Sequence, residues 1–233
     1  LEVEHICKSF EGTEVLKDIS FSLEKSQVLS IIGSSGSGKT TLLNLILGIT
    51  DIDKGSLVYN GRDLTRVPME QRGFNIVFQD YALFPNLNAY QNITYGLKNK
   101  PGISSKEEVE ELIDLLGLRE HLTKKIEQLS GGQKQRVLLS RALAGNSEIL
   151  ILDDSSSALD YKTDSMLRQA LRENYAGVTT IVIAQRVSSI LHADHILVLD
   201  EGREIGYGTH EQLMESCQIY REISESQMGG DFG

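Results

Sequence analysis

The sequence has no tryptophan, only two cysteines and three prolines in 233 residues, and no long apolar run. Cys7 and Cys217 lie far apart and show no metal-ligand spacing, which indicates reduced thiols in a cytosolic protein rather than a disulfide or metal centre. No stretch approaches the ~18 apolar residues that span a bilayer, and no signal-peptide pattern is present. We therefore expect another chain or segment to do any membrane spanning.

Basic residues are also scarce, since 23 Lys and Arg face 33 Asp and Glu and give a formal net charge of −10. A polyanion requires a basic surface, so nucleic acid is not expected to be the main partner. A small anion is still compatible with this charge, because backbone amides and one lysine can hold a phosphate group on an acidic protein. Hydrophobic residues make up 40% and charged residues 24%, which is ordinary for a soluble globular chain.

Short apolar strands alternate with helical segments along the chain, a pattern that predicts an α/β fold with a parallel sheet. The first residues alternate apolar and polar, as in Leu1–Ile6 and Ile19–Leu23, and predict earlier strands. The other strands are expected at Gln27–Ile32, Asn75–Gln79, Ile149–Leu152, Thr180–Ala184 and His195–Leu199. We expect a single domain over residues 1–233, with a core of 1–83 and 141–226, a helical subdomain at about 84–140 and a loose tail at 227–233.

A glycine-rich segment between an expected strand and an expected helix fits the pattern G-x-x-x-x-G-K-[ST] in full. Glycines let successive amides turn toward phosphate oxygens, and the helix N-terminus adds partial positive charge. Lys39 is expected to reach the β- and γ-phosphates of ATP, and the Thr40 hydroxyl to ligate Mg²⁺. A plain surface turn is the alternative, but the flanking elements and the lysine argue against it. The residues predicted to hold the nucleotide are Gly33, Ser34, Ser35, Gly36, Ser37, Gly38, Lys39, Thr40 and Thr41.

An acidic pair follows the apolar run Ile149–Leu152. Ligands bind at the carboxyl ends of parallel strands, so Asp153 is predicted to hold Mg²⁺ through water. The alternative is a strand end capped by solvated acids.

The pentapeptide Leu129-Ser130-Gly131-Gly132-Gln133 resembles the signature of ATP-binding-cassette (ABC) transporter ATPases and precedes a helical run at Gln135–Leu143. The resemblance implies a P-loop NTPase (RecA-like) core with an N-terminal antiparallel β subdomain and an inserted helical subdomain. It also implies a head-to-tail dimer with a second nucleotide-binding domain, in which Ser130, Gly132 and Gln133 face the γ-phosphate bound by the other protomer.

The same resemblance implies roles for residues elsewhere in the chain. Phe10 would stack on adenine, with Val15 beside the base, and stacking on an aromatic face is chemically sensible. Gln79 would touch Mg²⁺ or the attacking water, and Ser157–Asp160 would cross the dimer interface. The segment Gln79–Leu87 and the helical insert would dock on a transmembrane subunit, so that the chain lies at the cytoplasmic face of the membrane as a peripheral domain.

Two positions depart from the family pattern. Asp154 stands where a glutamate usually acts as general base, and its carboxylate falls ~1.5 Å short by one C–C bond. Gln185 stands where a histidine usually follows the next strand, and an amide carries no titratable proton. The catalytic set is therefore Lys39, Gln79, Asp154 and Gln185, and we expect ATP to be bound well but hydrolysed slowly, since losing a general base costs about 10²–10⁴ in rate.

The subgroup resemblance changes along the chain. Val77–Pro85 looks like the ATPase of an importer of metal ions, polyamines or other small solutes, whereas Ile149–Met228 looks like a multidrug-type exporter domain. The change falls near Gln133–Gly145, and we favour an engineered chimera over a natural mosaic. The transported substrate and the direction of transport stay open.

Two other functions share features with this sequence. A DNA-repair or chromosome-maintenance ATPase shares the motifs, but the segment between Thr40 and Leu129 holds no heptad array and the charge is acidic. A nucleotide-dependent dimerisation module with little hydrolysis is favoured by Asp154 and Gln185, and differs from a transport ATPase only in turnover.

Overall fold

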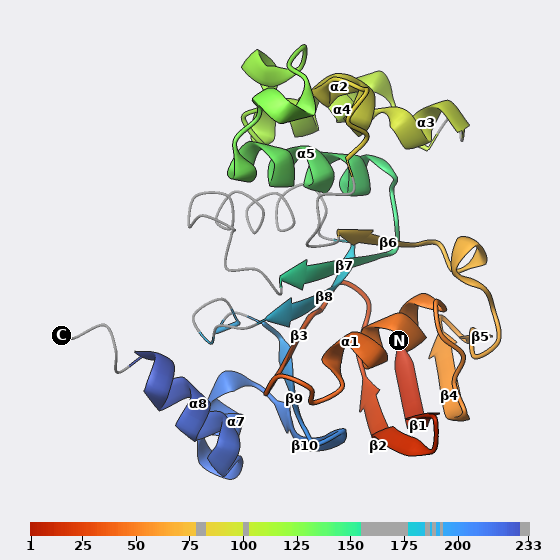
Figure 1. Ribbon diagram of the computed structural model, residues 1–233, viewed down its shortest axis with the longest axis vertical. Helices are drawn as coiled ribbons and strands as arrows, with labels where there is room; N and C mark the ends of the chain where they lie inside the picture. Colours follow the sequence, from red (N-terminus) through yellow and green to blue (C-terminus); the bar gives the residue numbers. More distant parts are fainter. Residues whose placement is uncertain are drawn as a thin grey trace. The chain divides into compact units, whose positions relative to one another are not determined.

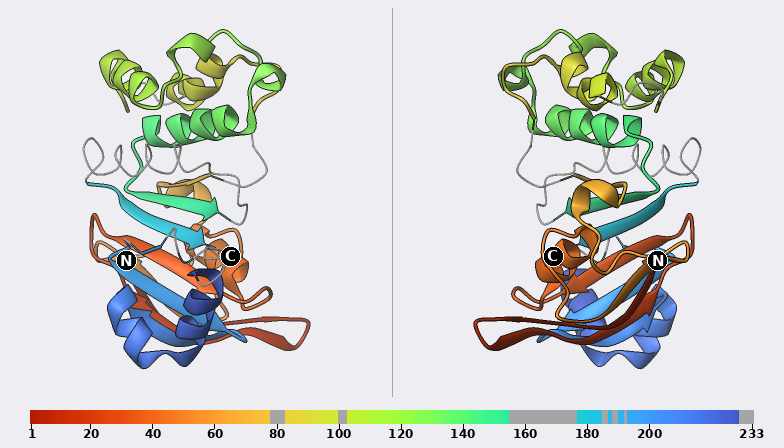
Figure 2. Two further views of the ribbon diagram at one scale, coloured as in Figure 1. Left: turned by 90° about the vertical axis from the view of Figure 1, so that its left-hand side faces the viewer. Right: turned by 90° about the vertical axis from the view of Figure 1, so that its right-hand side faces the viewer.

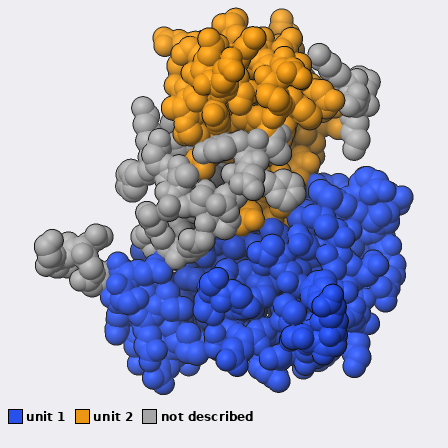
Figure 3. Space-filling model, viewed as in Figure 1, with its two compact units in different colours: residues 1–74, 179–233 blue, residues 75–178 orange. Residues whose placement is uncertain are grey.

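The structure is a computed structural model and describes residues 1–77, 83–99, 103–154, 177–184, 187, 190–191 and 193–228. The chain divides into two compact units, one of Leu1–Phe74 with Thr179–Gly233 and one of Asn75–Val178 (Figure 3).

The first unit begins with an antiparallel sheet in the order β2-β1-β4-β5. Strands β1 (Glu2–Phe10) and β2 (Thr13–Ser22) form a hairpin that closes through Glu11 and Gly12, both with positive φ. Strands β4 (Lys54–Tyr59) and β5 (Arg62–Asp63) complete the sheet. Val3 and Ile6 are both buried although they are three residues apart, because the register of β1 shifts between them, where His5 has positive φ. The predicted N-terminal antiparallel sheet is confirmed.

A second sheet in the first unit contains the parallel strands of the α/β core. Strand β3 (Val28–Gly33) runs parallel to both β8 (Thr179–Ala184) and β9 (His195–Asp200), and β10 (Arg203–Gly208) pairs antiparallel with β9. The middle of β3 is continuously buried, as expected for a strand covered on both faces. The predicted α/β class is thus confirmed (Figure 1).

Among the described residues of the first unit, helices α1 (Lys39–Leu47), α7 (His210–Ser216) and α8 (Gln218–Met228) pack against these sheets. Helix α1 contacts both β2 and β3, and its leucine-rich sequence is buried on several sides because it lies between the two sheets. Helices α7 and α8 lie beside β9 and β10 (Figure 2). Tyr220 is fully buried there, and its hydroxyl lies 2.8 Å from Nδ1 of His210.

The described part of the second unit holds a group of helices, strand β7 (Ile149–Asp154) and most of strand β6 (Phe74–Val77). Helices α2 (Ala89–Ile93), α3 (Tyr95–Asn99) and α4 (Lys106–Leu115) each contact α5 (Gly131–Ala144). The short 3₁₀ turns Arg119–His121 and Ile126–Gln128 lie between α4 and α5. Strands β6 and β7 are neighbours. None of the helices in the described ranges is long and apolar enough to cross a membrane.

The helix boundaries follow from local capping. Helix α5 begins at Gly131 rather than at Gln135, because Ser130 and Gln133 form a capping box. Helix α4 begins at Lys106, after the capping box of Ser105 and Glu108. The domain boundaries expected from the sequence, including the helical subdomain at about 84–140, stay a prediction.

A buried arginine fastens the end of α1. Arg72 is 7% exposed, and its Nη1 donates to the carbonyl oxygens of Leu45 at 2.8 Å and Ile46 at 2.7 Å. Its Nε donates to Val67 O at 2.7 Å. The last carbonyls of a helix lack intrahelical donors and carry partial negative charge, so a guanidinium there satisfies both needs.

Replacing Arg72 by methionine is expected to lower the free energy of unfolding by about 2–4 kcal/mol, because two buried hydrogen bonds and one partly buried hydrogen bond to carbonyl oxygens would lose their charged donor. Urea unfolding with unchanged m value measures the loss. Arg66→Met removes an exposed arginine nearby and serves as the control. Equal midpoints for the two variants would contradict the role assigned to Arg72.

Candidate nucleotide-binding site

The phosphate loop connects β3 to α1 and depends on glycine at two places. A Cβ on Gly33 would lie 2.1 Å from Leu199 O in β9, so the sheet excludes any side chain there. Gly38 has φ +102, a conformation that L side chains rarely adopt, and a Cβ there would meet the Leu16 side chain at 2.6 Å. The loop geometry therefore requires the glycines of the motif.

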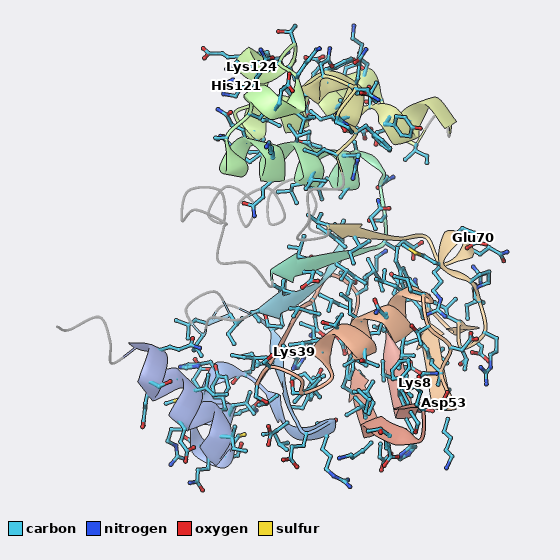
Figure 4. All side chains as sticks on the ribbon, viewed as in Figure 1. Lys8, Lys39, Asp53, Glu70, His121 and Lys124 are labelled. Atoms are coloured by element: carbon cyan, nitrogen blue, oxygen red, sulfur yellow. The ribbon has the colours of Figure 1, made fainter. Side chains whose placement is uncertain are left out.

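The Lys39 side chain folds back across the loop (Figure 4). Its Nζ donates to Gly33 O at 2.8 Å and to Ser34 O at 2.7 Å, and it lies 3.4 Å from Ser37 Oγ. These contacts hold the ammonium group over the loop backbone, where a phosphate oxygen can replace one of the carbonyl acceptors.

The N-terminus of α1 follows directly. Gly38 is its N-cap, and the structure shows no side-chain cap at that residue and no acidic residue in the first turn of the helix. Thr40 is exposed and Thr41 half-buried. The partial positive charge of this helix end is thus open to an anion, and the Thr40 hydroxyl is accessible to a metal ion.

A turn that the sequence analysis did not connect with the site braces the outer side of the loop. Between β9 and β10, Asp200 Oδ1 accepts a hydrogen bond from Ser34 Oγ at 3.2 Å. The Gly202 amide donates to Ser37 O at 3.2 Å, and Gly202 O accepts from the Lys17 amide at 2.8 Å. A Cβ on Gly202 would lie 2.1 Å from Val15 O. Hydrogen bonds and one close backbone approach therefore join the phosphate loop, this turn and strand β2.

The two residues assigned to the base lie on the β1–β2 hairpin. Val15 O would lie 3.3 Å from a Cβ on Gly38, so the structure brings Val15 next to the phosphate loop. Phe10 is 45% exposed, which leaves ring surface available for stacking. Its contact with a base stays a prediction.

The acidic residues lie in the second unit. Asp153 Oδ1 is buried and has no hydrogen-bond partner among the described residues. A buried carboxylate oxygen without a partner is costly, and hard oxygen ligands of this kind suit Mg²⁺ or one of its waters. Asp153 and the Thr40 hydroxyl are therefore chemically suited to the ion. Asp154 ends β7, but its side chain, Gln79, Gln185 and Ser157–Asp160 lie outside the described residues.

The signature residues form the N-terminus of the 14-residue helix α5. Ser130 Oγ accepts from the Gln133 amide at 3.3 Å, and Gln133 Oε1 accepts from the Ser130 amide at 2.9 Å. Gln133 Nε2 lies 2.9 Å from His121 Nε2. An amide nitrogen only donates, so this contact is a hydrogen bond in the tautomer of His121 that has Nε2 as the acceptor. His121 thus orients the signature glutamine. No spacing rule in the sequence indicates this contact. The role of Ser130, Gly132 and Gln133 toward a second ATP stays a prediction.

A buried parallel strand, a glycine-rich loop folded around a lysine and a helix N-terminus together define a P-loop nucleotide-binding protein. The family described as ABC transporter matches residues 16–157, more than half of the chain. The chain therefore belongs to the ABC transporter family, as its ATP-binding domain, which confirms the resemblance found in the sequence.

The comparisons include relatives from several bacteria. The spermidine/putrescine import ATP-binding protein PotA of Protochlamydia amoebophila is 38% identical over 234 residues, covering 98% of this chain and 61% of that protein. The protein of the same name from Thermotoga maritima is 37% identical over 222 residues, covering 93% and 60%. A solved structure of a bacterial Atm1-family ABC exporter with ATP bound superposes with a TM-score of 0.85 at 29% identity, covering 100% of this chain and 41% of that one.

The chain thus spans less than two thirds of the length of these relatives. The two import proteins match nearly the whole of this chain, across the expected junction as well. A junction between an importer-like part and an exporter-like part therefore stays a hypothesis.

Substitutions at two glycines with similar φ test whether the Asp200–Gly202 turn supports the phosphate loop. Gly202→Ala is expected to weaken Mg-ATP affinity about fivefold to tenfold, the equivalent of one lost hydrogen bond, because its Cβ would collide with Val15 O and displace the turn whose amide donates to Ser37 O. Gly61→Ala is the control, since Gly61 has φ +73 against +77 and a Cβ there meets nothing within 4 Å. Titration calorimetry measures both. Equal affinities for the two variants would show that the turn does not shape the loop.

Proposed function

We propose that this chain binds Mg²⁺-ATP at Gly33–Thr41 and couples ATP binding and hydrolysis to transport across a membrane. The observation that carries the proposal is the Lys39 ammonium group, held by two loop carbonyls at 2.8 Å and 2.7 Å beside an open helix N-terminus. This arrangement suits a triphosphate, because a cation and several amide donors converge on one small volume.

Each residue has a role in the proposed complex. Lys39 holds the β- and γ-phosphates, Thr40 and Asp153 hold Mg²⁺ with Gln79 nearby, and Phe10 and Val15 hold the base. The buried and unpartnered Asp153 Oδ1 supports the metal role. When bound, Mg²⁺ would neutralise charge on the phosphate oxygens.

The proposed partners are a second nucleotide-binding domain and a transmembrane subunit or domain. In a head-to-tail dimer, Ser130, Gly132 and Gln133 would supply a second helix N-terminus to the γ-phosphate of the other protomer. The segment Gln79–Leu87 and the helical insert would dock on the transmembrane part at the cytoplasmic face. The names of the relatives, polyamine import ATP-binding proteins and an ABC exporter, support a transport role and are divided on its direction.

Hydrolysis is proposed to be slow. Asp154 and Gln185 stand where the family pattern has glutamate and histidine, so the carboxylate that would take a proton from water is one methylene short. Lys39 and the loop amides would still bind the nucleotide. Affinity and turnover are therefore expected to be separable.

Steady-state phosphate release at saturating Mg-ATP tests the function, with Lys39→Ala as the blank. The proposal expects release above the blank but below ~1 s⁻¹, the low end of ordinary enzyme turnover. Release equal to the blank, together with ATP binding, would favour the second candidate, an ATP-dependent dimerisation module. Light scattering with and without ATP would then show whether the chain dimerises on nucleotide; both candidates are expected to dimerise, so phosphate release is the measurement that separates them.

Restoring the family residues tests the cause of slow turnover. Asp154→Glu combined with Gln185→His is expected to raise the phosphate-release rate by about 10²–10⁴, the value of a positioned general base. ATP affinity should stay unchanged, because neither position belongs to the phosphate loop Gly33–Thr41. The control is the same pair in a Lys39→Ala background, which should stay at the blank. An unchanged rate would show that these two positions do not limit hydrolysis.

A further inference from the structure

A lysine on β1 is almost buried although it lies close to the exposed hairpin end. The Lys8 side chain is 11% exposed, and its Nζ donates to Asp53 Oδ1 at 2.7 Å (Figure 4). The other carboxylate oxygen, Asp53 Oδ2, accepts from the Ser9 amide at 2.8 Å. The Lys8 hydrogen bond, followed by that of the Ser9 amide, lowers the pKa of Asp53, which favours the charged form of this carboxylate. The ammonium group is thus held in one place.

The fixed ammonium group lies over an aromatic ring. Lys8 Nζ is 5.2 Å from the centroid of the Phe10 ring, within the ~6 Å range of a cation–π interaction. Lys8 and Phe10 are two residues apart on one strand, which places both side chains on the same face. Phe10 is nevertheless 45% exposed, so ring surface remains for a second partner.

Asp53, which holds Lys8, is connected to the phosphate loop through helix α1 and the segment that follows it. Asp53 directly precedes β4 and follows the segment that leaves the C-terminus of α1. Its amide also donates to Cys7 O at 3.3 Å. The chain that leaves the phosphate-loop helix therefore holds the strand that carries Phe10.

We propose that Lys8 is a base-positioning residue: its ammonium group, fixed by Asp53, covers one face of the Phe10 ring and leaves the other face for adenine. This inference rests on the proposed ATP-binding function. A cation draws the ring electrons toward its own side and makes the opposite face less negative, which strengthens stacking with an electron-rich purine. Because Lys8 already occupies one face of the Phe10 ring, only the other face is available to the base.

The proposal predicts a loss that depends on the base. Lys8→Met keeps a similar length and removes the charge, and it is expected to weaken Mg-ATP binding about threefold to tenfold. Binding of inorganic tripolyphosphate, which has no base, should be unchanged. Titration calorimetry measures both. Unchanged ATP affinity, or equal losses for both probes, would overturn the proposal, since a merely structural ion pair cannot distinguish them.

A double-mutant cycle tests whether Lys8 acts through the ring. In a Phe10→Leu background, Lys8→Met should cause no further loss of ATP affinity, because the ring that transmits its effect is gone. A full loss in that background overturns the proposal. Lys8→Arg should keep the ATP affinity, since a guanidinium also pairs with a carboxylate and lies over aromatic rings.

Lys54→Met is the matched control for charge. Lys54 is exposed, adjoins Asp53 and pairs with Cys7 across β1 and β4. The same charge is removed, and ATP affinity should not change. A loss equal to that of Lys8→Met would assign the effect to long-range charge and overturn the proposal. Failure of the wild-type chain to bind either probe would instead overturn the proposed function itself, and this inference with it.

Discussion

The site depends on one close approach, in which the backbone of Gly33 lies against the Leu199 carbonyl of β9. Only a residue without a side chain fits, since a Cβ would be 2.1 Å from that oxygen. The approach places the Gly33 carbonyl where Lys39 Nζ donates to it at 2.8 Å, and the Ser34 carbonyl follows at 2.7 Å. The parallel pairing of β3 with β9 thus sets the position of the cation on which phosphate binding relies.

The loop is held from outside as well. The Asp200–Gly202 turn fastens Ser34 and Ser37, and the Gly202 carbonyl accepts from strand β2. At the other end of α1, Arg72 donates hydrogen bonds to the last carbonyl oxygens of the helix. The segment that follows α1 leads to Asp53, which holds Lys8 Nζ over the Phe10 ring. The phosphate loop, helix α1 and the Lys8–Phe10 pair are therefore linked by hydrogen bonds and by the chain itself within the first unit.

Local patterns in the sequence predicted the loop, the parallel strands and the N-terminal sheet, because glycine spacing and apolar alternation act over a few residues. The start of α5 was placed four residues late, although the Ser130 to Gln133 spacing carries the capping-box signal. Strand β10 was missed because Arg203–Gly208 is only partly apolar and contains two glycines. The contact between Ser34 and Asp200 joins residues 166 apart and has no local signal. The roles of Gln79 and Gln185 still rest on the sequence alone.

Hydrogen–deuterium exchange with and without Mg-ATP tests the central claim most directly, because the claim concerns particular backbone amides. The account predicts that saturating Mg-ATP slows exchange of the amides at 34–41, where the loop surrounds the phosphates, and that the Lys39→Ala variant shows little slowing at the same nucleotide concentration. Unchanged exchange at 34–41 in the wild-type chain, with ATP demonstrably bound, would contradict the account, because the nucleotide would then be held somewhere other than the phosphate loop.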